Sequence, residues 1–504
     1  MKTGRSCATP PRWSALLLLL SALATACGGP AQGGTGGVPL WPDTLLPADV
    51  TRAPRGFTPL RAAIHVHSLY SHDACDRHPV DEAGRPNEGC LARLRRAVCS
   101  AHLDAVFLTE HDRRLAEADS LRDALLLREG DTPVFIEGRL AAKLQQCPGG
   151  RAVWLAGAEN TFMPIAFDSL PRGSFIEKQQ FYDMAGPGAA DSFRAYGAVV
   201  LLSHPEDKTT EEVAQLAPDG IEVYNPHANF APKHRESQGL SRLGAYLRLA
   251  PLYARLTSAH PDLALLAIFH ANRNAITSWD AMLARRMVFA FGATDAHENA
   301  LPWRLSDGER GDAYARMLTW VTNILLVDGD ELSAQGNAPM AARDVGAIEV
   351  GAIDVGAIED AVRQGRFYVA IEAWGTPVAF DFRLEGPAGT TEMGGTVAAA
   401  ADQTLVVEPP RLSLRGLDPA AEPALPDPAI RARLYRIDPG GRRTVVAESA
   451  GTIRAPVPGP GAYRVEVGIV PHHLIPYLGT DDELLREIPW VYSNPIRVVE
   501  PANR

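Results

Sequence analysis

The sequence lacks an excess of positive charge, and beyond Leu23 it lacks any apolar stretch long enough to cross a bilayer. Its 504 residues include 49 Lys and Arg against 60 Asp and Glu, which gives a formal net charge of -11. Proteins that bind nucleic acid need a basic stripe to neutralise phosphates, so we expect no nucleic-acid partner. A chain of this length is expected to hold more than one domain, soluble or soluble on a tether. These features indicate no oligomeric state.

Cysteine is scarce, and no two cysteines have the CxxC spacing of zinc-thiolate sites. Four of the six cysteines lie in the body of the chain. Four thiols in an exported domain favour two disulfides over metal binding. Our hypothesis pairs Cys75 with Cys90, which closes a polar loop, and Cys99 with Cys147.

The N-terminus has the pattern of an export signal. Lys2 and Arg5 precede an apolar stretch from Trp13 to Leu23, and small residues lead into Cys27. We predict a signal peptide over 1–26, lipidation of Cys27 and a flexible Gly- and Pro-rich tether over 27–55. The alternative is an ordinary signal peptide that is cleaved elsewhere. We therefore expect an exported protein, either periplasmic or extracellular or held to a bacterial membrane only by a lipid anchor.

Two textures divide the remaining chain. Over 56–371, buried-strand patterns alternate with helical ones, which predicts an α/β domain with parallel pairing. Over 372–504, strands that alternate apolar with polar residues are separated by Pro/Gly-rich turns, which predicts an antiparallel β-sandwich. A threefold five-residue repeat at 345–359 is interpreted as a surface insertion before a helix at 360–364. The other expected helices are 88–102, 115–127, 175–184 and 240–256.

Six short apolar runs, each followed at once by residues that bind metals, are the main pattern in the first domain. Continuous apolar runs of this length are typical of strands buried on both faces. The runs with their polar ends are Ala62–His67, Val106–Asp112, Val153–Glu159, Val199–His204, Ile221–His227 and Val288–His297.

The strands of an α/β barrel place their carboxyl ends at one mouth, where the chemistry of such barrels occurs. Six imidazole- or carboxylate-bearing ends would converge there, so we predict a polynuclear metal site. Imidazole mixed with carboxylate suits Zn, Mn or Fe rather than Ca, whose sites are all oxygen. The pattern predicts a hydrolase that uses a metal-bound hydroxide, and no nucleophile elbow or P-loop competes with it.

The ordered motifs resemble one known family. They are His65-x-His67, Thr109-Glu110-His111-Asp112, Gly157-Ala158-Glu159, Ser203-His204-Pro205 and Thr294-Asp295-Ala296-His297. They resemble HxH, TDHD, Glu, HP and SDAH of the PHP (polymerase and histidinol phosphatase) family. The resemblance covers most of residues 60–300 and implies a distorted (β/α)7 barrel that holds two or three divalent ions.

The resemblance also implies how the ligands divide. A first ion would bind His65, His67, Glu159 and Asp295, with Glu159 bridging to a second ion that binds His204. A third ion would bind His111, His297 and a residue just after the first motif.

Two ligand positions are less closely matched. Many relatives have Ser-Asp-Gly where this chain has Ser71-His72-Asp73, and we favour His72 over Asp73 for the third ion. The second ion usually binds a further imidazole between His204 and Asp295. We favour His227, which directly follows a predicted strand, over His234, His260 and His270.

Asp112, Glu298 and Asp73 are candidates for proton transfer or for contacts behind the ligands, with Asp112 and Asp73 favoured as catalytic residues. Three further segments resemble the branch of PHP proteins that includes carbaryl-type hydrolases, whose members commonly carry a trailing β domain; they are Trp279–Leu283, Gly365–Tyr368 and Trp490–Ile496. We predict hydrolysis of a small-molecule or anionic ester, foremost a phosphoester. The alternatives are a carboxylic ester, carbamate or amide hydrolase at the same site, and a metal-stabilised protein that binds a cell-surface polymer.

Overall fold

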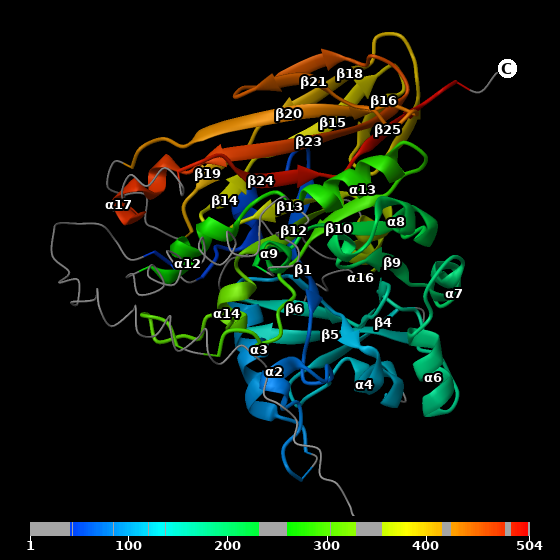
Figure 1. Ribbon diagram of the computed structural model, residues 1–504, viewed down its shortest axis with the longest axis vertical. Helices are drawn as coiled ribbons and strands as arrows, with labels where there is room; N and C mark the ends of the chain where they lie inside the picture. Colours follow the sequence, from blue (N-terminus) through cyan, green and yellow to red (C-terminus); the bar gives the residue numbers. More distant parts are fainter. Residues whose placement is uncertain are drawn as a thin grey trace, which may run out of the picture.

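A computed structural model describes residues 41–501 except positions 43, 84, 119, 137 and 303 and the segments 231–259, 329–354, 416–424 and 479–484. The expected signal peptide, Cys27, most of the tether, His234 and the whole of the expected helix 240–256 lie outside the described residues. The protein is a mixed α/β structure with one very large sheet (Figure 1).

The large sheet has thirteen strands and runs through most of the molecule. Its main path is β17 (Thr396–Ala398), β25 (Ile496–Val499), β23 (Gly461–Val470), β24 (Ile488–Ser493), β13 (Phe367–Ile371), β12 (Val321–Asp328), β1 (Phe57–Val66), β2 (Ala105–Leu108), β6 (Gly150–Leu155), β5 (Arg139–Cys147) and β4 (Thr132–Ile136). Off this path, β20 (Ala429–Ile437) pairs with β21 (Arg443–Ser449) and with β23. The expected division at residue 372 falls directly after β13, and the sheet continues across it because β13 pairs with β24.

The other strands of the described residues form four smaller sheets. A second sheet runs in the order β11 (Phe289–Gly292), β10 (Gly220–Tyr224), β9 (Val199–Leu202) and β8 (Met163–Ile165). A two-stranded sheet joins β3 (Glu110–His111) to β7 (Ala158–Glu159). In the C-terminal part, β16 (Gly389–Glu392), β15 (Asp381–Gly386), β18 (Thr404–Glu408) and β22 (Ile453–Pro456) form one sheet, and β14 (Thr376–Val378) pairs with β19 (Arg411–Ser413).

All six apolar runs form strands, but parallel pairing holds for only part of the N-terminal region. Strands β1, β2 and β6 are parallel to one another, and so are β9, β10 and β11. Strands β12, β13, β5, β4 and β8 pair antiparallel with their neighbours. An apolar run records burial on both faces and does not record direction, so the sequence pattern could not separate the two groups.

Helices connect and flank these strands. They are α2 (Ala74–Arg77), α3 (Glu88–Ser100), α4 (Asp112–Glu117), α5 (Leu121–Ala124), α6 (Phe175–Tyr182), α7 (Ala189–Arg194), α8 (Thr210–Leu216), α9 (Pro226–Phe230), α12 (Pro261–Ala264), α13 (Arg273–Leu283), α14 (Tyr314–Met317), α16 (Val355–Gln364) and α17 (Ile475–Leu478). Short 3-10 turns are η1 (Ala48–Thr51), η2 (Pro205–Asp207), η3 (Leu265–Ile268) and η5 (His472–Leu474). No helix in the described segments is long and apolar enough to span a bilayer.

Two helix predictions need correction. The expected helix 115–127 is two short helices, because Ala118 is extended and the Ser120 side chain caps α5 by accepting a bond from the Asp123 amide. The last copy of the five-residue repeat is the start of α16 and not a surface insertion. Val355, Ala357 and Ile358 from that copy are buried, since their spacing places them on one face of the helix.

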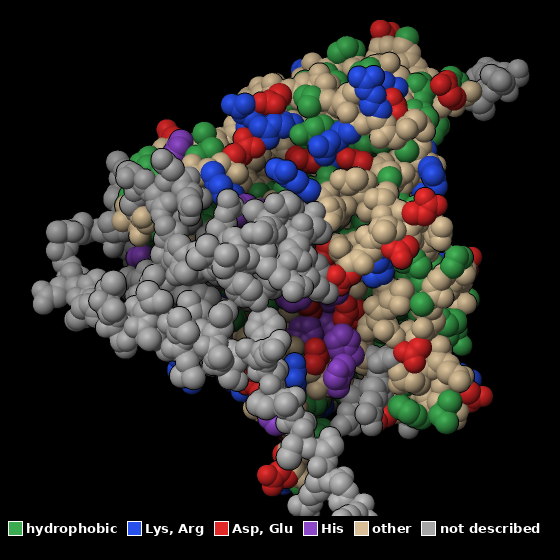
Figure 2. Space-filling model, in the orientation of Figure 1, with side chains coloured by type: hydrophobic (Ala, Val, Ile, Leu, Met, Phe, Trp, Pro, Cys, Tyr) green, Lys and Arg blue, Asp and Glu red, His purple; other side chains and the backbone are tan. Residues whose placement is uncertain are grey.

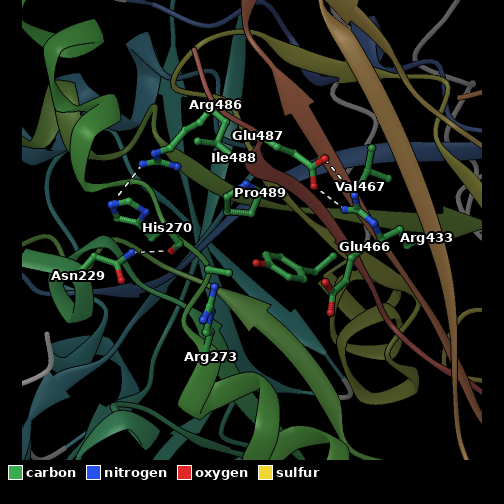
Figure 3. A pocket seen from close by; sticks show the side chains of 13 residues that line it. Asn229, His270, Arg273, Arg433, Glu466, Val467, Arg486, Glu487, Ile488 and Pro489 are labelled. Atoms are coloured by element: carbon green, nitrogen blue, oxygen red, sulfur yellow. Dashed lines mark hydrogen bonds and ion pairs between the residues drawn. The ribbon is translucent and has the colours of Figure 1, made fainter. Parts of the chain in front are cut away.

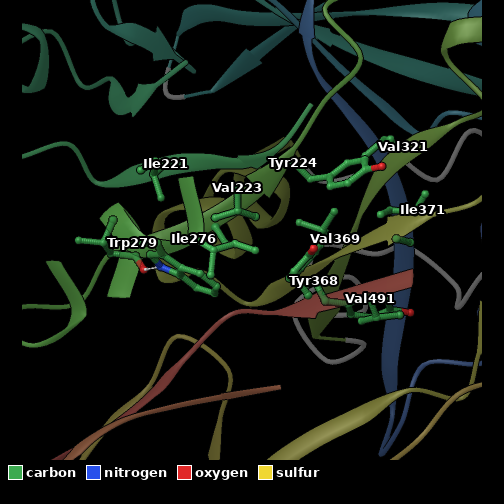
Figure 4. Close-up of a cluster of buried hydrophobic side chains, with 14 of the residues drawn as sticks. Ile221, Val223, Tyr224, Ile276, Trp279, Val321, Tyr368, Val369, Ile371 and Val491 are labelled. Carbon is green, nitrogen blue, oxygen red and sulfur yellow. Dashed lines mark hydrogen bonds between the residues drawn. The ribbon is translucent and has the colours of Figure 1, made fainter. Parts of the chain in front are cut away.

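The main hydrophobic core joins the second sheet to the C-terminal strands. Figure 4 shows Ile221 and Val223 of β10 and Trp279 of α13 near Val369 of β13 and Val491 of β24. Trp279 is fully buried, and its indole nitrogen donates to the carbonyl of Val288 at 2.9 Å. The core therefore crosses residue 372 as the large sheet does.

A cavity of about 400 Å³ remains where these regions meet, between β23, β24 and the loop before α13 (Figure 3). Most of its charged residues are paired, either with another lining residue or with a neighbour outside the cavity. Glu487 pairs with Arg433, and Glu466 pairs with Arg464. Arg486 donates to the carbonyl of Phe269 and contacts His270, so the cavity wall ties the C-terminal strands to the segment before α13.

The structure contains the two disulfides of the sequence hypothesis. Cys75 is bonded to Cys90 and Cys99 to Cys147, with Cα–Cα distances of 5.9 and 5.3 Å. Both bonds attach to α3, the first at its N-terminal turn and the second at its last turn.

Candidate metal centre

The predicted ligands come from different strands and meet at one place. His65 and His67 lie at the end of β1, His111 in β3, Glu159 in β7, His204 after β9, and Asp295 and His297 after β11. Figure 2 shows histidine and acidic side chains gathered together on one face of the molecule. Segments more than 200 residues apart along the chain therefore supply one cluster.

The backbone at three of these residues is left-handed, which is unusual for residues other than glycine. The φ angles are 68° for His65, 46° for His204 and 52° for Asp295. The pairing of β1 with β2 shifts register between Ala63 and Val66, so His65 lies in a bulge rather than in regular alternation. Bulges and strained φ values that re-aim a side chain are concentrated at functional sites.

The cluster is built around two carboxylates. Nε2 of His65 lies 3.3 Å from Oε1 of Glu159 and 3.2 Å from Oδ1 of Asp295. Nε2 of His67 lies 3.5 and 3.3 Å from Glu159 and Asp295. Nε2 of His204 lies 3.4 and 3.5 Å from the same two residues.

A second group adjoins the first on the side of His67. Nε2 of His111 lies 3.4 Å from Oδ1 of Asp73, and Nε2 of His297 lies 3.5 Å from Oδ2 of Asp73. Nδ1 of His111 is 3.4 Å from Oε2 of Glu159, which links the two groups. The rings of His67 and His297 stack with centroids 3.8 Å apart.

These spacings fit divalent ions better than direct hydrogen bonds. Charge-assisted hydrogen bonds are about 2.7–2.9 Å long. Two donors that each bind a tetrahedral ion at about 2.1 Å lie about 3.4 Å apart. Donor sets that could hold an ion include His67, His111 and His297; His65, His67 and Asp295; and His65, Glu159 and His204.

Five buried atoms of the cluster have no hydrogen-bond partner. They are Nε2 of His65, Nε2 of His67, Oδ1 of Asp73, Oδ1 of Asp295 and Nε2 of His297. A buried polar atom without a partner costs free energy, so proteins rarely retain one without a function. Five such atoms that face one another fit bound cations.

Further residues fix the orientation of each imidazole. Nδ1 of His65 contacts Oε1 of Glu222 at 2.8 Å, and Nδ1 of His297 contacts the carbonyl of Asp295 at 2.8 Å. Such contacts hold the proton on Nδ1 and leave Nε2 free to bind a metal.

His67 is oriented by a buried serine. Nδ1 of His67 lies 2.7 Å from Oγ of Ser71, which donates to Glu110 at 2.8 Å. Glu110 also accepts bonds from the amide and hydroxyl of Ser68. Because Ser71 uses its proton on Glu110, its oxygen accepts from His67, and Nε2 of His67 carries the lone pair.

The charges of the cluster shift one another's pKa values. Burial alone would raise the pKa of Asp295, but His297 and His65 hold it well below its ordinary value. Burial opposes a charged His65, yet Asp295, Glu159 and Glu222 raise its pKa well above the usual range. Burial and the nearby His297 lower the pKa of His67 to about 3. The carboxylates thus stay ionised and attract positive charge.

The remaining predicted residues lie at the edge of the cluster or outside the described part. His72 is exposed, with its ring centroid 5.1 Å from that of His111. His227 is also exposed, 5.8 Å from His204 between centroids, and can share an ion with His204 and Asp295. Asp112 begins α4, and its side chain is outside the described part of the structure.

The sequence reasoning did not assign Glu222. This residue is 1% exposed, and its second oxygen accepts from the amide of His204 at 3.0 Å. A usable signal was present, because Glu222 interrupts the apolar run Ile221–Tyr224, and a carboxylate in a fully buried strand needs a specific partner.

His260 and His270 lie away from the cluster. The His260 ring contacts Tyr477 with centroids 5.1 Å apart, and His270 lies against Arg486.

No protein-family profile and no curated protein matches this chain. Two solved structures show a weak overall similarity. One is a two-domain protein from Bacteroides vulgatus that contains a predicted PHP-like metal-dependent phosphoesterase; it is 12% identical, with 92% of this chain and 100% of that chain covered and a TM-score of 0.29. The other is PsfC from Pseudomonas syringae, 14% identical, with 54% and 83% covered and a TM-score of 0.28. Superpositions this poor say nothing about function, which is inferred below from the side chains of the cluster alone.

Proposed function

We propose that this protein is a metal-dependent hydrolase that acts on phosphoesters. The observation that carries the proposal is the set of five buried, unpartnered nitrogen and oxygen atoms that face one another at metal-ligand spacing. Ions held there would supply a Lewis acid and an activated water for hydrolysis.

In this proposal Glu159 and Asp295 hold the first ion together with His65 and His67. His204 completes a second position, with His227 beside it. The cluster offers several sets of carboxylate and imidazole donors, which agree with two or three bound ions of Zn, Mn or Fe.

A third position would be held by His111, His297 and Asp73. Asp73 replaces His72 as the favoured ligand in this proposal, because its Oδ1 is buried without a partner and lies near both imidazoles. His72 is left as an exposed group at the rim.

The residues around the ligands keep the site ready for substrate. Glu222 orients His65 and the backbone of His204, and the Ser71–Glu110 contact orients His67. Asp73 is partly exposed; burial would raise its pKa, but His111 and His297 hold that pKa well below its usual value, so in this proposal Asp73 is an ionised ligand and not the proton carrier that the sequence indicated. We also propose that the strands of the large sheet and of the second sheet that precede residue 372 form the distorted seven-stranded barrel, and that the strands after residue 372 form an accessory β-sandwich.

Metal analysis of the purified full chain, followed by assays on phosphate monoesters, phosphate diesters and aryl esters, tests the proposal. We expect bound transition metal and phosphoester hydrolysis that Glu159→Ala abolishes. Turnover of aryl esters or carbamates alone would show that the site is that of an ester or carbamate hydrolase and not of a phosphoesterase. Bound metal with no turnover on any substrate would favour the binding-protein alternative, and activity that survives Glu159→Ala would contradict the mechanism.

A further inference from the structure

The loop that carries Asp73 leads into three residues with an unfavourable backbone conformation. Cys75, Asp76 and Arg77, in α2, have φ angles of 56°, 58° and 66°. Three consecutive non-glycine residues in the left-handed region are unfavourable for L-amino acids, since Cβ approaches the following carbonyl oxygen. External contacts must therefore keep this segment in its observed conformation.

Those contacts connect the loop to the segment that follows Asp295. The amide of Cys75 donates to the carbonyl of His297 at 3.0 Å, and the amide of Asp76 donates to the carbonyl of Glu298 at 2.8 Å. The carboxylate of Asp76 pairs with Arg310. The strained loop and the His297 segment therefore lie against each other.

Helix α3 holds both segments from one side. Cys90, in its first turn, is bonded to Cys75, and both cysteines are buried. Arg93, one turn further along, pairs with the buried Glu298 at 2.7 Å. The disulfide is thus the covalent one of the contacts by which α3 holds the Asp73 loop and the His297 segment together.

The other carboxylates of the centre have a different support. Glu159 lies in β7, and Asp295 follows β11, so hydrogen-bonded strands hold them. Asp73 precedes α2 in a loop whose nearest covalent attachment is two residues away at Cys75. Loss of that bond should disturb the Asp73 position and leave the Glu159–Asp295 position in place.

We propose that the Cys75–Cys90 disulfide is a positioning element for Asp73, and that its reduction weakens one ion position of the centre selectively. The inference rests on the proposed metal centre and adds a redox requirement to it. Reduction by a dithiol transfers two electrons and two protons to the Cys75–Cys90 bond, which gives two thiols and a disulfide in the reductant.

The second disulfide is a matched control for stability. Cys99–Cys147 closes 48 residues, whereas Cys75–Cys90 closes 15. In the chain-entropy account a longer loop gives more stabilisation, so a purely stabilising role predicts a larger effect from Cys99–Cys147. A positioning role predicts the reverse order when metal binding is measured.

The experiment measures the stoichiometry and affinity of Mn²⁺ in the full chain by equilibrium dialysis and metal analysis. The variants are Cys75→Ser with Cys90→Ser, Cys99→Ser with Cys147→Ser, and Asp73→Asn. We expect the first cysteine pair, which positions Asp73, to weaken one position by about 10- to 100-fold, as for groups that orient metal ligands. Asp73→Asn, which changes the ligand itself, should weaken the same position at least as much, and the other positions should be unchanged. The Cys99/Cys147 variant should bind as the unmodified chain does.

A second measurement avoids dependence on the folding of the variants. The unmodified chain is reduced with a water-soluble phosphine, which does not chelate the ions as a dithiol does, and mass spectrometry of alkylated peptides identifies the chains in which Cys75–Cys90 is reduced. Their metal content is measured before and after reoxidation; we expect one position to weaken and recover. Equal losses in both cysteine variants, or no change in either, would overturn the inference. If the oxidised chain bound no Mn²⁺ or Zn²⁺ at all, the proposed function itself would fail, which is a different result.

Discussion

Strand β1 contributes to two buried charged clusters that are built in opposite ways. Near its middle, Arg61 is fully buried and pairs with Glu372 through two bonds of 2.9 Å. Glu372 also accepts from Thr322 and Thr376, so its oxygens are satisfied. Four residues further along, His65 enters a cluster in which five buried atoms have no partner. The polar atoms of the first cluster are paired within the protein, whereas the proposed cations would supply the missing partners of the second.

This contrast separates structural from functional buried charge. Both clusters incur the cost of removing ions from water. At Arg61 the bidentate pair and two hydroxyl groups offset that cost within the protein. At the candidate metal centre we propose that bound cations supply the offset, and the difference can be tested with the same acid-to-amide change in each cluster.

The largest effect should follow Asp295→Asn. Loss of this carboxylate removes a ligand shared by the central imidazoles, and we expect hydrolysis to fall on the order of 10³-fold, the scale for loss of a group that stabilises transition-state charge. The metal-free protein should lose less free energy of unfolding than Glu372→Gln does, because the imidazoles that face Asp295 can give up their charge, whereas the Arg61 guanidinium cannot. Steady-state kinetics and calorimetry after chelation would check both parts, and a folded variant with full activity would contradict the assignment.

Glu372→Gln should have the opposite profile. An uncompensated Arg61 would remain in the interior, which costs about 3 kcal/mol or more. We expect a lower free energy of unfolding in urea, with metal content and turnover per folded molecule unchanged. If Glu372→Gln lost metal without losing stability, the Arg61–Glu372 pair would be part of the metal site and not a separate structural pair.

Glu222→Gln tests the contact behind the ligands. The amide can no longer accept from His65 as a carboxylate does, so the imidazole is a weaker ligand, and metal affinity should fall about 10- to 100-fold. Competition with a chelator of known affinity would measure it. Glu466→Gln, a change at a partly buried acid of the C-terminal strands, is the matched control and should leave the affinity unchanged.

The smallest effect concerns pH and a histidine away from the centre. Burial lowers the pKa of His473 to about 4, although its ring bonds to the carbonyl of Trp374 at 2.8 Å. Below pH 6.5 the unfolded chain takes up a proton that the folded chain refuses, so stability falls as pH decreases towards 4. Between pH 6.5 and 5.5 the loss should be about 1 kcal/mol. His473→Gln should remove that part of the slope in urea titrations at both pH values, and an unchanged slope would refute the account.

The sequence predicted which imidazoles and carboxylates lie together more completely than it predicted the architecture around them. His65, Glu159, His204 and Asp295 follow apolar runs, and strand ends that share an edge bring them together. The pattern did not separate parallel β2 from antiparallel β12, since both are buried on two faces. The motif alignment favoured His72 over Asp73; the structure places the Asp73 carboxylate 3.4 and 3.5 Å from His111 and His297, next to a left-handed turn at Cys75 that no local propensity encodes, and which of the two residues binds an ion stays a prediction.

Glu222 shows a different limit. Its residue type was visible in the strand, but its partners, His65 and the amide of His204, come from distant segments. The expected helix 115–127 failed for a local reason, since a serine that caps a new helix outweighed the continuing apolar pattern.

The pairing of β13 with β24 limits how this chain could have been assembled or could be re-engineered. A cut at residue 372 would leave β13 with a bare row of amides and carbonyls, an edge that recruits foreign strands and aggregates. The C-terminal region therefore cannot be replaced by another domain through a simple exchange at residue 372. Any transplant would have to bring a replacement for β24 with matching register, and evolution would have faced the same constraint.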